Sequence, residues 1–353
     1  MTEPVSRDLN GPAIGDDAMP VVVVGAHSQS LFMHVSVIPR EGETVAAHGF
    51  EETLDGGKAT NQAVAAARLG APVRFVSLVG DDERGRWVLR YLHEQGVDTR
   101  WVGVADGPTD VGFVMLAPSR IPAIASCDDL SGRLDEAFVA EAATAIAGAS
   151  IVVCQLEAPP ASAVAAFTLA KAAGARTLLN PAPASPLSPE LLRVTDILVP
   201  NEHEAAVLIG LEGPVADRAH RLAQNMPWAS VIVTAGSDGA YVARAGSPTE
   251  HIEAPVLTSI DSTGAGDAFV GALAAQLRSG MSILDAARFA VIAAAISVTR
   301  AGTMRAFATA EEVAARAERA GVERVDRIVD DGCQAVANPG VRAAIPSTVP
   351  DHR

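Results

Sequence analysis

A loop of small and polar residues runs into a helix-like segment at positions 261–273, and it carries one acidic side chain that could act in catalysis. Residues Thr263 to Gly266 are small enough for the backbone to approach a ligand closely. Their N–H groups would point outward at the positive end of a helix dipole, and such a nest of amides suits an anion. A carboxylate such as Asp267 repels phosphate, but a base for a hydroxyl that attacks phosphate has to lie at this place. The alternative is that Asp267 only caps the helix, because Asp is a favoured N-cap residue.

A second glycine-rich stretch lies near the N-terminal end of the chain. Residues 56–63 read Gly-Gly-Lys-Ala-Thr-Asn-Gln-Ala, and Gly70 and Gly80 follow, so a loop, a helix, a strand and another turn come in a fixed order. Two segments between the glycine-rich stretches begin with asparagine: residues 180–183 read Asn-Pro-Ala-Pro, and residues 201–204 read Asn-Glu-His-Glu.

The two glycine-rich stretches together resemble the paired signatures of the ribokinase-like, or PfkB, carbohydrate kinases. The two asparagine segments fall where ribokinases carry similar segments, and the resemblance covers about residues 20–310. It implies an ATP-dependent transfer of a phosphoryl group to a hydroxyl of a sugar or sugar-like molecule. The sequence contains no G-x-x-x-x-G-K-[ST] loop, so the phosphates of ATP would have to be held in another way.

The resemblance assigns the transfer chemistry to the loop at 263–267, with Asp267 as the base that accepts the proton of the acceptor hydroxyl. It implies an anion hole that stabilises the transferring group, formed by Thr263, Gly264, Ala265 and Gly266.

The acceptor would bind at the other glycine-rich loop, where glycine permits close approach and Lys and Asn supply hydrogen bonds to hydroxyls. The residues that match the sugar-binding positions of the family are Gly56, Gly57, Lys58, Asn61 and Glu157. The alternative is that Lys58 and Asn61 only begin a solvated helix, and that Glu157 is a surface carboxylate at the end of a strand.

The nucleotide and metal sites are also implied by the resemblance. The ATP-binding residues would be Asn201, Thr234, Gly236, Gly239 and Thr263. Glu204 would hold Mg²⁺ through water, because magnesium gives up its waters reluctantly. Asn201 could equally be a helix N-cap, and both roles can hold at once.

A monovalent cation, K⁺, is often bound beside the anion hole in this family. The matching positions here are Asp261, Thr263, Ser297 and Gly302. Ala306 stands where ribokinases have a serine that completes the site, so K⁺ binding stays an open question for this sequence.

The sugar end departs from the ribokinase pattern. Ribokinases carry Asn and then Asp soon after the first strand, whereas Ser28 and Ser30 occupy these places here. One buried carboxylate that accepts two hydroxyls discriminates strongly, and two serines cannot replace it. The segment Cys127-Asp128-Asp129 also replaces the Gly-Ala-Asn of ribokinases. We therefore predict an acceptor that is not simply ribose, or a ribose grip that is rebuilt.

The elements that position these residues alternate between strand-like and helix-like segments, which predicts an α/β fold with a mainly parallel central sheet flanked by helices. Residues 21–24 read as a buried first strand. The segments 31–54 and 100–126 read as short strands, and neither segment contains a crossover helix. We therefore expect them to form a small separate sheet, with strands at 101–104, 111–116 and 121–125 in its second part. The resemblance implies that this sheet is a lid over the sugar and a surface for homodimers.

The domain boundaries follow from composition. We expect one kinase domain at 20–320. The N-terminal residues 1–19 are rich in Pro, Gly and Asp, which predicts a loose, disordered tail, and residues 321–353 lack a sustained pattern, which predicts a C-terminal tail.

The overall charge and the cysteines limit the classes of partner and compartment. A formal net charge of −15 without a Lys/Arg-rich run makes nucleic acid and anionic membranes poor partners. No stretch of about 18 uncharged apolar residues predicts a membrane span, and the first residues lack the apolar core of a signal peptide. The 3 cysteines are scattered, which favours a reduced, cytoplasmic setting.

The leading interpretation is an ATP- and Mg²⁺-dependent kinase of a sugar or polyol. A nucleoside kinase would need aromatic stacking, but aromatic residues make up 4% of the chain and Phe269 is the one aromatic residue within the motifs. A non-catalytic sugar or nucleotide sensor would have no need of Asp267. A dinucleotide oxidoreductase would need G-x-G-x-x-G after the first strand, and residues 25–27, Gly-Ala-His, do not supply it.

Overall fold

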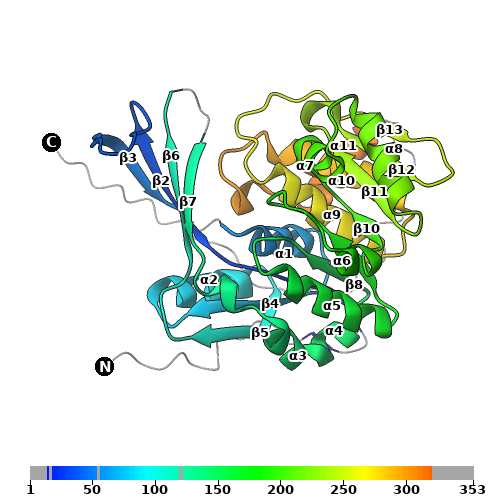
Figure 1. Cartoon of the computed structure of the whole chain (residues 1–353), viewed down its shortest axis with the longest axis horizontal. Coiled ribbons are helices and arrows are strands. Elements are labelled where there is room, and N and C mark those ends of the chain that lie inside the picture. The colour runs from blue at the N-terminus through cyan, green and yellow to red at the C-terminus, as the bar shows by residue number, and fades with distance from the viewer. Residues whose placement is uncertain (1–13, 16–17, 54–55, 119–121, 320–353) are drawn as a thin grey trace.

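Two β-sheets make up the frame of the molecule (Figure 1). The computed structural model of the chain describes residues 14–15, 18–53, 56–118 and 122–319. The predicted C-terminal tail and most of the predicted N-terminal tail lie outside the described residues.

The large sheet has nine strands in the order β13-β12-β11-β10-β9-β8-β1-β4-β5. All neighbouring pairs are parallel except those of β12 with β11 and β13. Its strands are β1 (Val21–Val24), β4 (Val73–Gly80), β5 (Val97–Ala105), β8 (Ile151–Cys154), β9 (Arg176–Leu179), β10 (Ile197–Leu198), β11 (Ser230–Thr234), β12 (Ala240–Arg244) and β13 (Glu250–Ile252). The predicted α/β fold with a mainly parallel central sheet is confirmed.

The first strand shows why the sequence forms this sheet. All four valines of β1 are buried, and they alternate between two hydrophobic cores: Val21 and Val23 pack on one face of the sheet, and Val22 and Val24 pack on the other. A strand that is apolar on both faces is typical of the centre of a parallel sheet. β1 accordingly lies between β4 and β8.

Helices cover both faces of the large sheet (Figure 1). One face carries α1 (Lys58–Arg68), α2 (Glu83–Glu94), α9 (Ala265–Arg278), α10 (Ile283–Ser297) and α11 (Ala310–Arg319). The other face carries α3 (Glu136–Glu141), α4 (Ala143–Ala147), α5 (Pro160–Ala172), α6 (Pro189–Arg193), α7 (Glu202–Ile209) and α8 (Val215–Asn225). None of the helices in the described part of the chain is long and apolar enough to cross a membrane.

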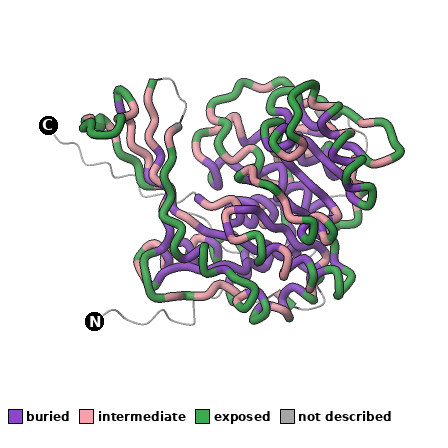
Figure 2. Tube along the Cα trace, in the orientation of Figure 1, coloured by how far each residue is buried: buried purple, intermediate pink, exposed green. Residues whose placement is uncertain are grey.

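The small sheet has four strands in the order β3-β2-β6-β7 and stands to one side of the large one (Figure 1). Its strands are β2 (Gln29–Val35), β3 (Ala47–Glu52), β6 (Val111–Leu116) and β7 (Pro122–Cys127). Figure 2 shows that it is far more exposed than the body of the molecule. The prediction that residues 101–104 belong to this sheet was wrong. They are part of β5, which pairs in parallel with β4 at the edge of the large sheet, because α2 provides the crossover between these two strands.

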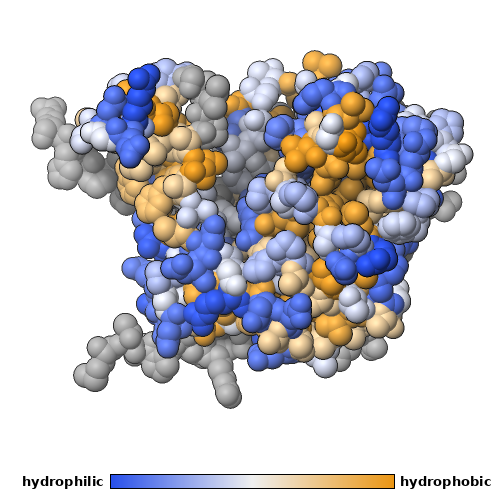
Figure 3. All heavy atoms as spheres, viewed as in Figure 1, coloured by the Kyte–Doolittle hydropathy of each residue, from blue (hydrophilic) through white to orange (hydrophobic). Residues whose placement is uncertain are grey.

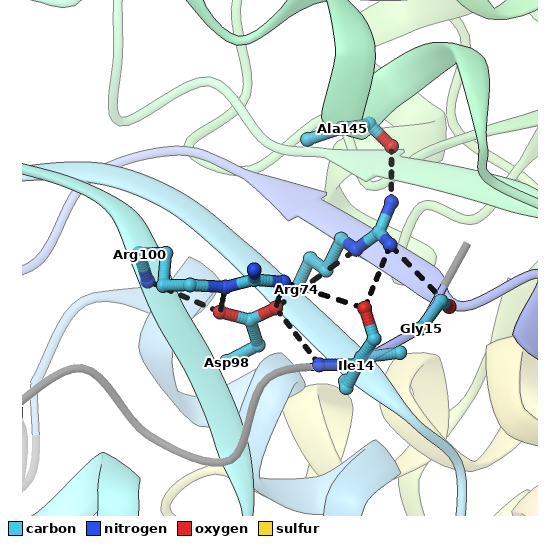
Figure 4. Close-up of polar contacts among 6 residues, drawn as sticks. All are labelled: Ile14, Gly15, Arg74, Asp98, Arg100 and Ala145. Atoms are coloured by element: carbon cyan, nitrogen blue, oxygen red, sulfur yellow. Dashed lines mark hydrogen bonds and ion pairs between the residues drawn. The ribbon is translucent and has the colours of Figure 1, made fainter.

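A buried ion pair anchors the start of the described chain to the edge of the large sheet (Figure 4). Arg74 Nε lies 3.9 Å from Asp98 Oδ2, and both side chains are almost fully buried. Arg100 Nη2 also donates to Asp98 Oδ2, at 2.7 Å. Arg74 Nη2 donates to the backbone oxygens of Ile14 and Gly15. Part of the segment that we predicted to be a loose tail is therefore hydrogen-bonded to the body.

Candidate functional site

The loop before α9 adopts a backbone conformation that only glycine tolerates well. Gly264, the N-cap of α9, has φ 75° and ψ 3°, which is left-handed. A Cβ atom at this position would lie 2.2 Å from Thr303 Cγ2. Asp267 does not cap the helix, because it lies within the first turn of α9 with its side chain buried. The helix N-terminus at 264–266 thus remains available to an anion.

The carboxylate of Asp267 is held by two side chains of α1. Asn61 Nδ2 donates to Asp267 Oδ2 at 2.9 Å, and Gln62 Nε2 donates to Oδ1 at 3.0 Å. Burial raises the pKa of the Asp267 carboxyl above its ordinary value, against the opposing effect of the Lys58 ammonium and of these hydrogen bonds. A buried carboxylate of raised pKa is suited to accept a proton.

Lys58 and Glu157 meet at the start of α1. The backbone nitrogen of Lys58 donates to Glu157 Oε2 at 2.6 Å. Burial raises the pKa of Glu157 to about 7, in spite of the Lys58 charge. Burial alone would lower the pKa of Lys58, but the neighbouring carboxylates, Asp267 foremost, raise it above its ordinary value. The structure thus brings together three predicted site residues that are far apart in the sequence.

A cavity of about 180 Å³ connects these residues to the second asparagine segment. The predicted site residues that line it are Lys58, Asn201, Glu204, Thr234, Gly264, Ala265, Gly266 and Asp267. Asn201 is the N-cap of α7 and forms a capping box with Glu204, so the capping alternative for Asn201 is confirmed. Burial raises the pKa of the Glu204 carboxyl, although the backbone hydrogen bond to Asn201 opposes this.

An apolar pocket of about 330 Å³ adjoins this cavity and shares Thr234, Ala265 and Gly266 with it. Gly236 and Gly239, which we predicted to bind ATP, line it. The sequence did not predict the other apolar residues of its wall, which are Ala254, Pro255, Val256, Leu257, Phe269, Val291, Ala294, Ala295 and Val298. The sequence carries little indication that α10 contributes to a pocket, because residues 291–298 have the pattern of an ordinary buried helix.

A larger cleft of about 960 Å³ separates the small sheet from the body, and it is visible as a hollow in Figure 3. The small sheet lines it with Phe32, His34, Glu51 and Leu116 among others, and the body lines it with residues 259–263 and 301–303. Ser262, which we did not predict, lines all three cavities and therefore lies where they meet.

The serines at the sugar end lie next to the glycine loop. A Cβ atom on Gly56 would come within 1.8 Å of the Ser28 backbone oxygen, so the two segments are in close contact. The Ser30 backbone oxygen accepts a hydrogen bond from Thr53 N at 3.0 Å. Both serine side chains are half-buried. Gly57 has φ 75°, which favours glycine before α1.

Three of the predicted cation positions are joined by hydrogen bonds. Asp261 Oδ1 accepts from Thr263 N at 2.9 Å, and Oδ2 accepts from Gly302 N at 3.0 Å. These bonds lower the pKa of Asp261, although its partial burial works in the other direction. The Ser297 hydroxyl donates to the Ala294 backbone oxygen at 2.8 Å. Ala306 is buried and offers no side-chain oxygen.

Known proteins are similar to this chain in architecture and in sequence. The sequence profile of the pfkB family carbohydrate kinases matches residues 20–310. Ribokinase of Haemophilus influenzae is 35% identical over 298 residues, which cover 83% of this chain and 96% of that protein. Deoxyribokinase of Salmonella typhi is 31% identical over 300 residues, covering 83% and 97%. The solved structure of Arabidopsis thaliana ribokinase complexed with ribose and ATP superposes with a TM-score of 0.77 at 28% identity and covers 84% of this chain and 97% of that chain.

Proposed function

The chain belongs to the pfkB family of carbohydrate kinases, and we propose that it transfers the γ-phosphoryl group of ATP to a hydroxyl of a sugar or similar polyol, with Asp267 as the base. One observation carries the proposal: the buried Asp267 carboxylate lies between the amides of the helix N-terminus at 264–266 and the Lys58 side of the acceptor loop. A base at this place can accept a proton from a hydroxyl that attacks a phosphate held by the amides.

The nucleotide lies across the two smaller cavities in this proposal. The apolar pocket between α9 and α10 has the walls that an adenine ring requires, and the adjoining polar cavity leads the phosphates to Gly264, Ala265 and Gly266. The backbone amides of this loop then stabilise the charge on the transferring group.

Glu204 would hold Mg²⁺ through water in this proposal. Both carboxylate oxygens of Glu204 already accept hydrogen bonds from Asn201, at 2.8 Å each, which favours contact through metal-bound water. Bound Mg²⁺ supplies positive charge that offsets the charge on the phosphates. A K⁺ ion beside Asp261 stays a prediction, and the dependence of kcat on K⁺ against Na⁺ tests it.

The acceptor is proposed to lie against Gly56, Gly57, Lys58 and Glu157, with Asn61 holding the base. Ser28 and Ser30 stand next to this loop in place of a carboxylate, so we retain an acceptor other than ribose, or a rebuilt ribose grip. The deoxyribokinase relative acts on a different pentose from the ribokinases at similar identity, which supports a variable sugar end.

The small sheet is proposed to act as a lid and as a dimer surface. It faces the body across the 960 Å³ cleft, and its closure would exclude water that could accept the phosphoryl group. Phe50, opposite Met33 in the sheet, is 61% exposed and supplies apolar surface for a second copy. Sedimentation velocity of wild type beside Phe50→Asp tests the homodimer.

An assay of candidate acceptor molecules with ATP and Mg²⁺ tests the proposed function. Pentoses, hexoses, polyols, sugar acids, sugar phosphates and nucleosides are each supplied with ATP and Mg²⁺, and ADP release is measured against a reaction without acceptor. We expect acceptor-dependent turnover with a neutral sugar or polyol. Efficient use of ribose at micromolar concentrations would refute the predicted change at the sugar end, and turnover with nucleosides alone would favour the nucleoside kinase. No turnover with any acceptor would favour the sensor.

A further inference from the structure

Three amide side chains form a hydrogen-bonded network that is centred on Gln62 and includes the Asp267 carboxylate. Asn180, from the Asn-Pro-Ala-Pro segment, bonds to Gln62, and Gln62 bonds to both Gln155 and Asp267. Gln62 is 0% exposed and Gln155 is 3% exposed. The proposed reaction assigns no role to any of these amides, although burying a polar network of this kind is costly, and Gln155 Oε1 has no hydrogen-bond partner among the described residues.

The orientation of this network is set by the backbone. The Val199 carbonyl oxygen can only accept, so the nitrogen of the Asn180 amide has to face it, and Nδ2 lies 2.9 Å away. Asn180 Oδ1 therefore faces Gln62 and accepts from Gln62 Nε2 at 3.0 Å. The same nitrogen then points its second hydrogen at Asp267 Oδ1, 3.0 Å away. Gln155 Nε2 donates to Gln62 Oε1, which agrees with this orientation.

We propose that Asn180, Gln62 and Gln155 are positioning residues that keep Oδ1 of Asp267 a hydrogen-bond acceptor, so that the proton of the acceptor hydroxyl is received on Oδ2. The proposal rests on the proposed role of Asp267 as base. A carboxyl group that takes up one proton keeps one carbonyl oxygen, which is the better acceptor, so the Gln62 donor favours the proton on the other oxygen.

The proposed transfer forms one bond to the γ-phosphorus of ATP and breaks another. The oxygen of the acceptor hydroxyl forms a bond to the γ-phosphorus of ATP, the bond from that phosphorus to the bridging oxygen breaks, and ADP leaves with the electron pair. The hydroxyl proton moves to Asp267 Oδ2.

The Asn61 amide can change from hydrogen-bond donor to acceptor when Asp267 takes up this proton. In the structure its Nδ2 donates to Oδ2 of the ionised Asp267. Asn61 Oδ1 is buried and has no hydrogen-bond partner among the described residues, so the backbone does not fix this amide as it fixes Asn180. A half-turn of the Asn61 amide presents Oδ1 to the proton on Asp267 Oδ2. One carboxylate oxygen thus has a fixed donor, and the other has a partner that can reverse.

The test is a titration of the Asp267 carboxyl by ¹³C NMR, in protein labelled at aspartate carboxyl carbons and assigned by comparison with Asp267→Asn. Gln62→Leu removes the donor to Oδ1 of Asp267, and we expect the Asp267 pKa to rise by about one pH unit. Asn180→Leu and Gln155→Leu make no direct hydrogen-bond change at Asp267, yet each releases the Gln62 amide, and we expect smaller upward shifts. Gln276→Leu, at a buried glutamine further along α9, is the matched control and should leave the titration unchanged.

Kinetics separate positioning from general structural support. In the three leucine variants the acid limb of the kcat profile should move to higher pH with the titration, while KM for the acceptor changes little. The inference is overturned if every folded variant among the three titrates as wild type does, or if Gln276→Leu shifts Asp267 as much. The NMR result does not depend on turnover, so it stands apart from a failure of the kinase proposal, which would show as unchanged kcat in Asp267→Asn.

Discussion

Asn61 and Asp267 stand 206 positions apart in the chain, and the Asn61 side-chain nitrogen donates to Asp267 Oδ2 over 2.9 Å. The contact joins α1, which begins at the proposed acceptor loop, to α9, which begins at the proposed anion-binding loop. In the proposed reaction, the geometry between acceptor, base and phosphate depends on how closely these two helices pack.

Gly271 permits that close packing. A Cβ atom on Gly271 would lie 2.6 Å from Ala65 Cβ and 2.6 Å from the Gln62 backbone oxygen, so α1 would have to move away from α9. Helix propensity alone would make Gly271→Ala stabilising by about 1 kcal/mol. We expect instead a net loss of about 1–2 kcal/mol in the free energy of unfolding, because overpacking dominates, together with a fall in kcat of about tenfold or more.

Urea unfolding and steady-state kinetics check this expectation. Gly132→Ala is the control, since a Cβ atom there has no neighbour within 4 Å. A stabilised Gly271→Ala protein with wild-type kcat would show that the distance between the helices does not matter for the reaction.

The sequence was sufficient to predict most of the polar residues that line the 180 Å³ cavity, because they lie in short motifs at loop and helix starts. Two of these motifs are short runs of neighbouring residues: Gly56, Gly57 and Lys58 in one, and Gly264 to Asp267 in the other. Residues that are adjacent in the sequence remain adjacent in the folded chain. The position of Glu157 could also be predicted from the sequence, because Glu157 follows a buried strand. The carboxyl ends of parallel strands meet at one edge of the sheet.

Other features could not be predicted from local pattern. Ala294 and Val298 line the apolar pocket, but their sequence is that of any buried helix. Gln62 reads as one more residue of α1, and its bond to Asp267 depends on helix packing. The membership of β5 in the large sheet depended on which strand it pairs with, and period-two patterning carries no information about the partner.

Acceptor binding should depend on pH through Glu157, whose pKa burial raises to about 7. Below that pH the carboxyl is protonated and no longer accepts hydrogen bonds from the acceptor as an anion, so KM for the acceptor should rise as pH falls through about 7. Glu157→Gln should have a higher KM that varies little with pH. A wild-type KM that is flat from pH 6 to 8 would contradict the assignment.

The Glu157 carboxyl should also affect the free energy of unfolding. Because the pKa is higher in the folded than in the unfolded chain, the protonated Glu157 favours folding at low pH, and this contribution is lost as pH rises through about 7. Glu157→Gln should therefore gain stability relative to wild type above pH 7, measured by urea unfolding at pH 6 and pH 8.

The buried Asp98 should matter for stability and not for chemistry. Asp98→Asn would leave the Arg74 guanidinium, which is 2% exposed, without its counter-charge (Figure 4). We expect a loss of about 3–5 kcal/mol in the free energy of unfolding, with kcat unchanged below the unfolding transition. The control is Glu190→Gln, whose pair with Arg193 is mostly exposed and should contribute less than about 1 kcal/mol. Equal losses in both variants would contradict the role of burial.

The apolar pocket should govern affinity for the nucleotide. Ala294 lines it, so Ala294→Phe would fill the space that we propose for the adenine ring. We expect KM for ATP to rise at least about tenfold, which corresponds to about 1.4 kcal/mol, while KM for the acceptor changes little. Ala161→Phe, at an exposed position on α5, is the control. A rise in KM for the acceptor alone would mean that the pocket belongs to the acceptor.

The measurement that tests the account most directly is kcat for Asp267→Asn beside its affinity for ATP. Removal of a general base should lower kcat by about 10²- to 10⁴-fold, and ATP affinity should be kept or improved, because a charge that repels phosphate is gone. Asp285→Asn, in the first turn of α10, is the matched control and should retain wild-type kcat. An Asp267→Asn enzyme that turns over as fast as wild type would contradict the central claim.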